Sequence, residues 1–346
     1  MTEGTRDWYL RAARELAATS PRQVEWCFGV AHDDRVLALL DALPRPARQP
    51  SLLFAVAAYL GVPDAPYAVW ADAVLARAED LARELPRRRV QTNEPGRCVP
   101  LLVALAHIPG PIALVELGAS AGLCLLPDRY GYRFRTPDGE AGVALGDGSP
   151  VLEARLDAVL VPDALPDIRW RRGVDLAPLD ARDADDARWL EASLPPDRPE
   201  RRERLRAALA AARAHPVEVV AGDALAALPA AVADALAALP AAATASATLV
   251  VATLGTAVYL PPADRERLLA AIAGAGGRAV TFEARGALPE VTERWAALAA
   301  EGRADAAAGF VLALDGVPLA SGSPHGDVLE AVRPPAGRPG TEAHRS

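Results

Sequence analysis

One short stretch combines an acid with small residues in an order that suits ligand binding. It is Glu116-Leu-Gly-Ala-Ser-Ala-Gly122, and its first two residues end the apolar run Ile112–Leu117. Glycines in such a turn let a ligand approach the backbone closely, and they expose N–H groups at the start of a following helix. The order E-x-G-x-S-x-G differs from the GxGxxG of dinucleotide sites. The acid favours a cationic or amino-acid ligand over a diphosphate, although an ordinary strand-to-helix turn has the same composition.

Two further acids follow apolar runs later in the chain. Asp175 ends Gly173-Val-Asp175, and Asp223 lies in Gly222-Asp-Ala224. A carboxylate at the end of a strand can accept hydrogen bonds from ribose hydroxyls, which favours Asp175 for this role over the less well placed Asp180. Asp223 can accept from an adenine amino group while Ala224 donates a backbone N–H. A helix N-cap is the alternative for both Asp175 and Asp223.

The same turn also contains the G-x-S-x-G pattern of hydrolase nucleophile elbows, with Ser120 as the nucleophile. His325 follows it in the order that a catalytic triad needs, with Glu283 or Asp315 as the acid between them. However, only helical patterns precede the turn, whereas a hydrolase places several strands before its elbow. This hydrolase interpretation remains a secondary hypothesis.

Candidates for a catalytic base are few. Thr253 lies in a stretch at the end of a predicted strand, and Glu283 ends the next strand. Threonine cannot act as a base near neutral pH, which leaves Glu283 and two histidines, His107 and His325, each of which could equally well be a structural residue.

The elements that would position these residues alternate between strands and helices from residue 111 onward. Short apolar runs predict buried strands at 112–117, 168–175, 217–220, 248–254 and 278–283, and helical patterns lie between them. The segments 310–314 and 317–320 flank Asp315-Gly316, which predicts a closing hairpin. We expect an α/β fold with a Rossmann-like, mostly parallel sheet that ends in an antiparallel hairpin.

The domain organisation follows from a change of pattern near residue 108. Residues 1–108 have helical periodicity throughout, which predicts a helical N-terminal cap. Residues 109–333 form the Rossmann-like domain, with a Gly-rich insertion at about 131–166. We expect the tail, 334–346, to be disordered.

Composition excludes several classes of protein. The net charge is −8, there is no Lys and no long basic run, and we therefore expect no nucleic-acid or membrane partner. A P-loop needs Lys, and no metal-binding motif is present. The three cysteines form no CxxC pair, which predicts reduced thiols in a cytoplasmic protein. A small-molecule substrate fits best, and the oligomeric state is open.

The turn and the two acids, each after a strand, resemble the class I S-adenosylmethionine-dependent methyltransferases. The resemblance implies that Gly118, Ala119, Ser120 and Gly122 line the methionine part of the cofactor and that Glu116 lies near its amino group. It further implies that Asp175 holds the ribose, and that Asp223 and Ala224 hold the adenine.

A closer resemblance covers about residues 5–335. The chain is similar to a bacterial family of uncharacterised proteins, the domain of unknown function 2332, in the strings QTNEPGR (91–97), ELGASAG (116–122), DRY (128–130), WRRGVD (170–175), PLD (178–180) and YLP (259–261). This resemblance implies that Asn93, Glu94 and Arg97 cover the cofactor or substrate, although a helix start at Pro95 accounts for the same residues. Many members have His at the position of Thr253, which puts catalysis in doubt.

These observations predict a methyltransferase that uses S-adenosylmethionine and a small-molecule acceptor. A non-catalytic S-adenosylmethionine-binding or regulatory protein of the same fold is the first alternative, and a serine hydrolase using Ser120 is the second.

Overall fold

The computed structural model describes residues 4–17, 19–137, 142–238 and 247–335. The chain forms two compact units. Unit 1 comprises residues 1–93 and 179–214, and unit 2 comprises residues 94–178 and 215–346. The part of the predicted disordered tail beyond residue 335 lies outside the described residues.

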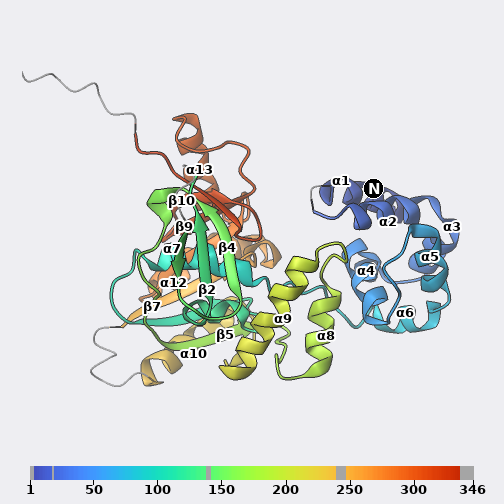
Figure 1. Ribbon diagram of the computed structural model, residues 1–346, viewed down its shortest axis with the longest axis horizontal. Coiled ribbons are helices and arrows are strands. Elements are labelled where there is room, and N and C mark those ends of the chain that lie inside the picture. The colour runs from blue at the N-terminus through green and yellow to red at the C-terminus, as the bar shows by residue number, and fades with distance from the viewer. Residues whose placement is uncertain (1–3, 18, 138–141, 239–246, 336–346) are drawn as a thin grey trace, which may run out of the picture. The chain divides into compact units, whose positions relative to one another are not determined.

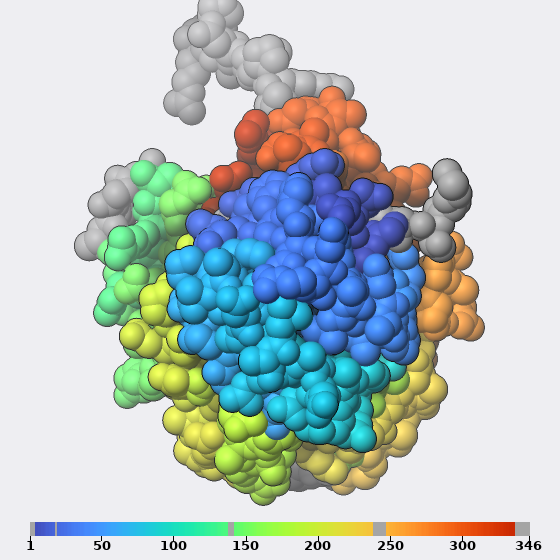
Figure 2. Space-filling view, turned by 90° about the vertical axis from the view of Figure 1, so that its right-hand side faces the viewer, coloured from blue at the N-terminus to red at the C-terminus, as the bar shows by residue number. Residues whose placement is uncertain are grey.

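Unit 1 is helical and has its own core. Its helices are α1 (Thr5–Glu15), α2 (Pro21–His32), α3 (Asp34–Asp41), η1 (Arg45–Arg48), α4 (Pro50–Tyr59), α5 (Tyr67–Leu75), α6 (Ala78–Glu84), α8 (Ala184–Ala192) and α9 (Pro199–Ala214). Trp26 stacks on Trp70 with ring centroids 4.7 Å apart, and Phe54 packs edge-on against Trp70. Figure 2 shows the surface of this unit, on which the blue and light-blue N-terminal segments lie next to one another.

Unit 2 is an α/β unit built on one sheet (Figure 1). Its elements are η2 (Pro95–Arg97), α7 (Cys98–Leu105), β1 (Ile112–Leu117), η3 (Leu123–Leu125), η4 (Pro127–Arg129), β2 (Gly131–Arg135), β3 (Val143–Leu145), β4 (Val151–Leu156), η5 (Ala158–Leu160), β5 (Ile168–Asp175), β6 (Val219–Ala221), α10 (Ala224–Ala238), β7 (Thr248–Leu254), η6 (Ala257–Tyr259), α12 (Pro262–Gly274), β8 (Arg278–Ala284), α13 (Pro289–Ala300), β9 (Phe310–Leu314), β10 (Val317–Gly322) and β11 (Val328–Ala331).

The described strands form an 11-stranded mixed sheet in the order β3-β2-β4-β11-β10-β9-β8-β7-β1-β5-β6. The run β8-β7-β1-β5-β6 is parallel, and β9 joins β8 in the antiparallel sense. The predicted hairpin is confirmed: β9 and β10 pair around Asp315 and Gly316, whose φ angles of 50° and 74° are those of a tight two-residue turn. The predicted α/β class is likewise confirmed.

Hydrophobic burial explains why the central strands form. All six residues of β1 are buried, as expected for a parallel strand with both faces covered. One face of the sheet packs against α10, α12 and α13. In this layer the side chain of Trp295 is 1% exposed. The other face carries α7, which packs against β8 and β9. Fully burying one Leu or Val side chain contributes about 1.5–3 kcal/mol.

The division into units differs from the predicted boundary at residue 108. Helix α7 belongs to unit 2, because all eight of its residues are buried and it packs on the sheet. Helices α8 and α9, predicted within the Rossmann-like domain, belong to unit 1, where Trp189 joins the helical core. The insertion at 131–166 adds β2, β3 and β4 to the same sheet; β2 pairs antiparallel with β3 but parallel with β4.

Candidate functional site

The candidate residues of unit 2 lie at one edge of the sheet. The parallel strands β1, β5, β7 and β8 all end there, and β10 does too because two antiparallel steps separate it from β8. From β1, the chain adds β5 and β6 on one side of β1, and it then adds β7 and β8 on the other side. The order of the strands therefore reverses between β1 and β7. Open α/β sheets bind ligands at such a switch point, outside the carboxyl ends of the strands.

The turn after β1 has an unusual backbone. Gly118, Ser120 and Gly122 have φ angles of 77°, 52° and 73°, in the left-handed region. Glycine is required at 122, because a Cβ there would lie 2.5 Å from Val217. Ser120 adopts this conformation without being glycine, which is a strained arrangement typical of functional turns. The helix that we expected to follow this turn is instead two short 3₁₀ turns, η3 and η4.

Asp175 organises this turn. At the end of β5, its Oδ2 accepts a hydrogen bond of 2.8 Å from the Ser120 N–H, and its Oδ1 accepts one of 2.9 Å from the Ala177 N–H. The side chain is half-buried. The two predicted features, the turn and the first acid, are therefore in direct contact. Asp180 lies in unit 1, where its carboxylate pairs with Arg182 at 2.9 Å.

The space over Gly118 is filled. A Cβ at Gly118 would lie 2.2 Å from the Thr256 Oγ1 and 2.3 Å from its Cγ2. The turn therefore does not present an open slot at this residue. A ligand that runs along the turn must pass the Thr256 side chain.

Glu116 is buried on the face of the sheet that carries α7. Its side chain is 3% exposed and its Oε2 makes no hydrogen bond within the described residues. Burial raises the pKa of Glu116 well above the ordinary glutamate value, and the nearby charge of Arg97 opposes part of that rise. The predicted acid is thus an interior group beneath the turn.

The two candidate catalytic residues, Thr253 and Glu283, lie together on the face of the sheet that is opposite to Glu116. Thr253 is 1% and Glu283 3% exposed. Glu283 accepts a hydrogen bond of 3.0 Å from the Thr256 N–H, so it holds the loop after β7. Burial raises the pKa of Glu283, and the N–H groups of Thr256 and Ala257 oppose that rise.

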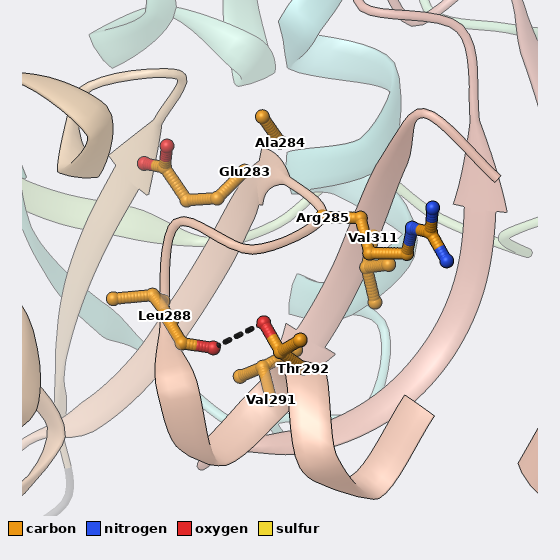
Figure 3. A pocket seen from close by; sticks show the side chains of 7 residues that line it. All are labelled: Glu283, Ala284, Arg285, Leu288, Val291, Thr292 and Val311. Carbon is orange, nitrogen blue, oxygen red and sulfur yellow. Dashed lines mark hydrogen bonds between the residues drawn. The ribbon is translucent and has the colours of Figure 1, made fainter. Parts of the chain in front are cut away.

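A small pocket lies beside Glu283. Its lining residues are Glu283, Ala284, Arg285, Leu288, Val291, Thr292 and Val311. Figure 3 shows the Glu283 carboxylate turned away from Leu288 and Arg285, while Thr292 donates a hydrogen bond of 2.7 Å to the Leu288 carbonyl. The other polar side chains that line this pocket are those of Arg285 and Thr292.

Asp223 caps a helix, as the alternative interpretation predicted. Its Oδ1 accepts hydrogen bonds from the N–H groups of Leu225 and Ala226, 3.1 and 3.0 Å away, at the start of α10. The side chain is exposed, and Ala224 beside it is buried. Asp223 follows β6, two strands away from β1 in the sheet.

The segment 93–97 is divided between the units. Asn93, 7% exposed, belongs to unit 1, whereas Glu94 and Arg97 belong to unit 2. Glu94 caps η2, and its Oε1 accepts a hydrogen bond of 3.2 Å from the Gly96 N–H. Arg97 donates to the Leu254 carbonyl at 2.6 Å and to the Pro324 carbonyl at 3.2 Å. It therefore joins the end of β7 to the turn after β10.

The structure also brings together two cysteines that are 26 residues apart in sequence. The Cys98 thiol donates a hydrogen bond of 3.7 Å to the Cys124 carbonyl, the Cys124 thiol donates one of 3.4 Å to the Glu94 carbonyl, and both side chains are buried. Burial raises the pKa of Cys98, and the neighbouring Cys98 thiol is the largest cause of the raised pKa of Cys124. No spacing in the sequence indicated this pair.

Residues 6–331 match the family model described as "Uncharacterized protein conserved in bacteria (DUF2332)". The chain belongs to the DUF2332 family. No curated protein and no solved structure matched this DUF2332 chain. The family is thus established over nearly the whole chain, and the resemblance to this family that we noted in the sequence is confirmed.

Two further observations concern the described part of this DUF2332 protein. No helix among these residues is both long and apolar enough to cross a membrane. No three His, Cys, Asp or Glu side chains come together there in an arrangement that could hold a metal ion.

Proposed function

We propose that this protein binds S-adenosylmethionine at the edge formed by β1 and β5 and transfers its methyl group to a small-molecule acceptor. The observation that carries the proposal is the contact between Asp175 and the turn after β1. It brings a half-exposed carboxylate, suited to ribose hydroxyls, beside a backbone turn rich in small residues.

The strand order supports this proposal. Across the sheet, the parallel strands lie in the order β6-β5-β1-β7-β8. If they are numbered by their sequence, this order is third, second, first, fourth and fifth, which is the order of nucleotide-binding doubly wound sheets. The antiparallel strand β9 beside the fifth strand resembles the end of methyltransferase sheets rather than the all-parallel sheets of dehydrogenases.

The residues present fit the nucleoside part of the ligand better than the methionine part. Asp175 retains acceptor capacity, because each of its oxygens receives a single backbone hydrogen bond. Asp223 uses one oxygen as the helix cap and is exposed, so it can also accept from an adenine amino group. The methionine part would run along residues 118–122, where Thr256 must turn aside.

Isothermal titration calorimetry with S-adenosylmethionine and S-adenosylhomocysteine tests the proposal. We expect micromolar binding by the wild type and a loss of about tenfold or more in Asp175→Asn, since hydrogen bonds to a charged group contribute about 1.5–3 kcal/mol. Asp180→Asn is the matched control and should keep wild-type affinity, because the Asp180 carboxylate already pairs with Arg182.

Two results would contradict the proposal. The first is no binding of either ligand by folded wild-type protein. The second is equal affinity in the wild type and Asp175→Asn. A protein that binds S-adenosylmethionine but transfers no methyl group from it would be the non-catalytic relative that the sequence also allows.

The left-handed backbone of Ser120 favours a second candidate function, a serine hydrolase, because nucleophile elbows have such a strained turn. A fluorophosphonate probe tests it directly. Covalent labelling of the wild type that disappears in Ser120→Ala would support the hydrolase, and an unlabelled wild-type protein would exclude it. Ser120 is only 5% exposed, and we therefore expect no labelling.

A further inference from the structure

The backbone that follows β7 is held by several contacts. The Gly255 N–H donates a hydrogen bond of 2.8 Å to the Phe282 carbonyl, and Arg97 donates one of 2.6 Å to the Leu254 carbonyl. A Cβ at Gly255 would lie 2.6 Å from the Arg97 Nη1, so the guanidinium packs directly on this backbone. We therefore expect the next residue, Thr256, to move by rotation of its side chain and not by movement of its backbone.

The Thr256 side chain now lies over the turn after β1. A Cβ at Gly118 would be 2.2 Å from its Oγ1 and 2.3 Å from its Cγ2, so both of these atoms face Gly118. The substituents of a threonine Cβ occupy three staggered positions, and the third, which holds the hydrogen, therefore points away from Gly118. A rotation of χ1 by about 120° can move the hydroxyl into that position. It replaces one of the two atoms beside Gly118 with hydrogen.

A buried carboxyl oxygen next to Thr256 has no hydrogen-bond partner. The Oε1 atom of Glu283 accepts the hydrogen bond of 3.0 Å from the Thr256 N–H, whereas its Oε2 makes no hydrogen bond within the described residues. The Glu283 side chain is only 3% exposed. Buried polar atoms without a partner are rare in folded proteins, and they often belong to functional sites. The Oε2 atom therefore has the capacity to bind one further polar group.

The hydroxyl of Thr256 suits this oxygen. A threonine hydroxyl lies close to the N–H of its own residue, and the two oxygens of a carboxyl group are neighbours. Glu283 can therefore bind the N–H of Thr256 with one oxygen and its hydroxyl with the other. An ionised Oε2 accepts a hydrogen bond from the hydroxyl, and a protonated one donates to it, so the contact does not depend on the charge of Glu283.

We propose that the Thr256 side chain is a gate on the ligand edge and that Glu283 holds the gate open. In the closed state, which this structure shows, the side chain lies over Gly118. In the open state its hydroxyl bonds to the Oε2 of Glu283, and the methionine part of S-adenosylmethionine passes beside Gly118. A ligand that binds only the open state has a lower affinity when the closed state is favoured. The identity of the ligand rests on the proposed function, whereas the two positions of the side chain do not.

A crystal structure of Gly118→Ala tests the gate without any ligand. The added methyl group occupies the space that the closed side chain needs. We expect Thr256 to be rotated in this variant, with its Oγ1 within hydrogen-bond distance of the Glu283 Oε2. A Thr256 side chain that keeps its position while the turn moves away, or a hydroxyl that points elsewhere, would overturn the role given to Glu283.

Calorimetry with S-adenosylhomocysteine tests the gate in three variants of Thr256. Thr256→Val keeps the shape of the side chain but cannot bond to Glu283, and it should bind the ligand about tenfold more weakly, which is the effect expected of one hydrogen bond. Thr256→Ser keeps the hydroxyl and should bind at least as tightly as the wild type. Thr256→Ala removes the obstacle itself and should bind more tightly. A merely structural role of Thr256 would not give opposite effects for Val and Ala.

The chain offers a matched control for the change from Thr to Val. Thr281 lies on β8, two residues before Glu283, and its hydroxyl makes no hydrogen bond within the described residues. Thr281→Val should therefore keep the wild-type affinity. An affinity of Thr256→Val equal to that of the wild type would overturn the gate.

The outcomes separate this inference from the proposed function. If the folded wild type binds no S-adenosylhomocysteine, the proposed function fails, and the structure of Gly118→Ala still decides whether Thr256 turns to Glu283. If the wild type binds the ligand and Thr256→Val binds it equally tightly, the gate is overturned and the proposed function stands. If Gly118→Ala does not fold, the calorimetric series decides alone.

Discussion

Replacing Gly118 by Ala tests the geometry of the turn, because the structure separates two costs at this residue. The first is the left-handed backbone, with φ at 77°, which costs an L-residue about 1–2 kcal/mol. The second is the Thr256 side chain, whose Oγ1 lies 2.2 Å from the position of the new Cβ. Overpacking of this kind costs about 1–3 kcal/mol. We therefore expect Gly118→Ala to lower the free energy of unfolding by about 2–5 kcal/mol.

The chain contains a matched control for the first cost. Gly276 has a φ of 75°, and a Cβ there would meet no atom within 4 Å. Gly276→Ala should therefore show the backbone cost alone, about 1–2 kcal/mol. At Gly118, by contrast, the added side chain would also collide with Thr256.

Urea denaturation followed by circular dichroism measures both costs, and the variant Thr256→Gly completes a double-mutant cycle. Removing the Thr256 side chain also removes the collision, so Gly118→Ala should cost about 1–3 kcal/mol less in that background. Equal costs in the two backgrounds would show that Thr256 does not lie against Gly118, and the reasoning about this turn would be refuted.

Three further predictions concern Glu283, the cysteines and Thr256. Burial raises the pKa of Glu283, so the folded state binds the proton of this carboxyl group more tightly than the unfolded state does. The free energy of unfolding of the wild type should therefore fall relative to that of Glu283→Gln as the pH rises above about 4.3. The expected fall is about 1.4 kcal/mol per unit of pKa shift. Urea titrations at several pH values check this, and a constant difference would contradict it. Burial raises the pKa of Cys27 to about 12, and Cys98 and Cys124 are buried too, so a thiol reagent at about pH 8 should label none of them before denaturant is added; rapid labelling of the native protein would refute that. Thr256→Ala should tighten S-adenosylmethionine binding in calorimetry, because it clears the path beside Gly118, and weaker binding would argue against that path.

The sequence was sufficient to predict the main elements of the sheet. Strand β7 is a run of apolar residues bounded by breaks, and a run of this length in an alternating chain is typical of a buried strand. The hairpin at Asp315-Gly316 was equally clear, because both residues readily adopt left-handed backbone angles. The predicted order of turn and acid was also informative, since Ser120 and Asp175 prove to be hydrogen-bonded.

The contacts between distant segments could not be predicted in this way. Nothing in the local pattern around Thr256 indicates that its side chain covers Gly118, because the two residues meet only through the pairing of β1 with β7. Likewise, Glu94 and His325 are far apart in the chain, and they approach each other because β10 ends at the same edge as β7. Helices α8 and α9 carried a helical signal but no information about which core they would join.

A crystal structure of the protein with S-adenosylhomocysteine is the most direct test of the central claim. It should show the ribose hydroxyls bound to Asp175, with the Thr256 side chain turned away from Gly118. A ligand bound elsewhere on the protein, or a ribose that makes no contact with Asp175, would contradict the claim.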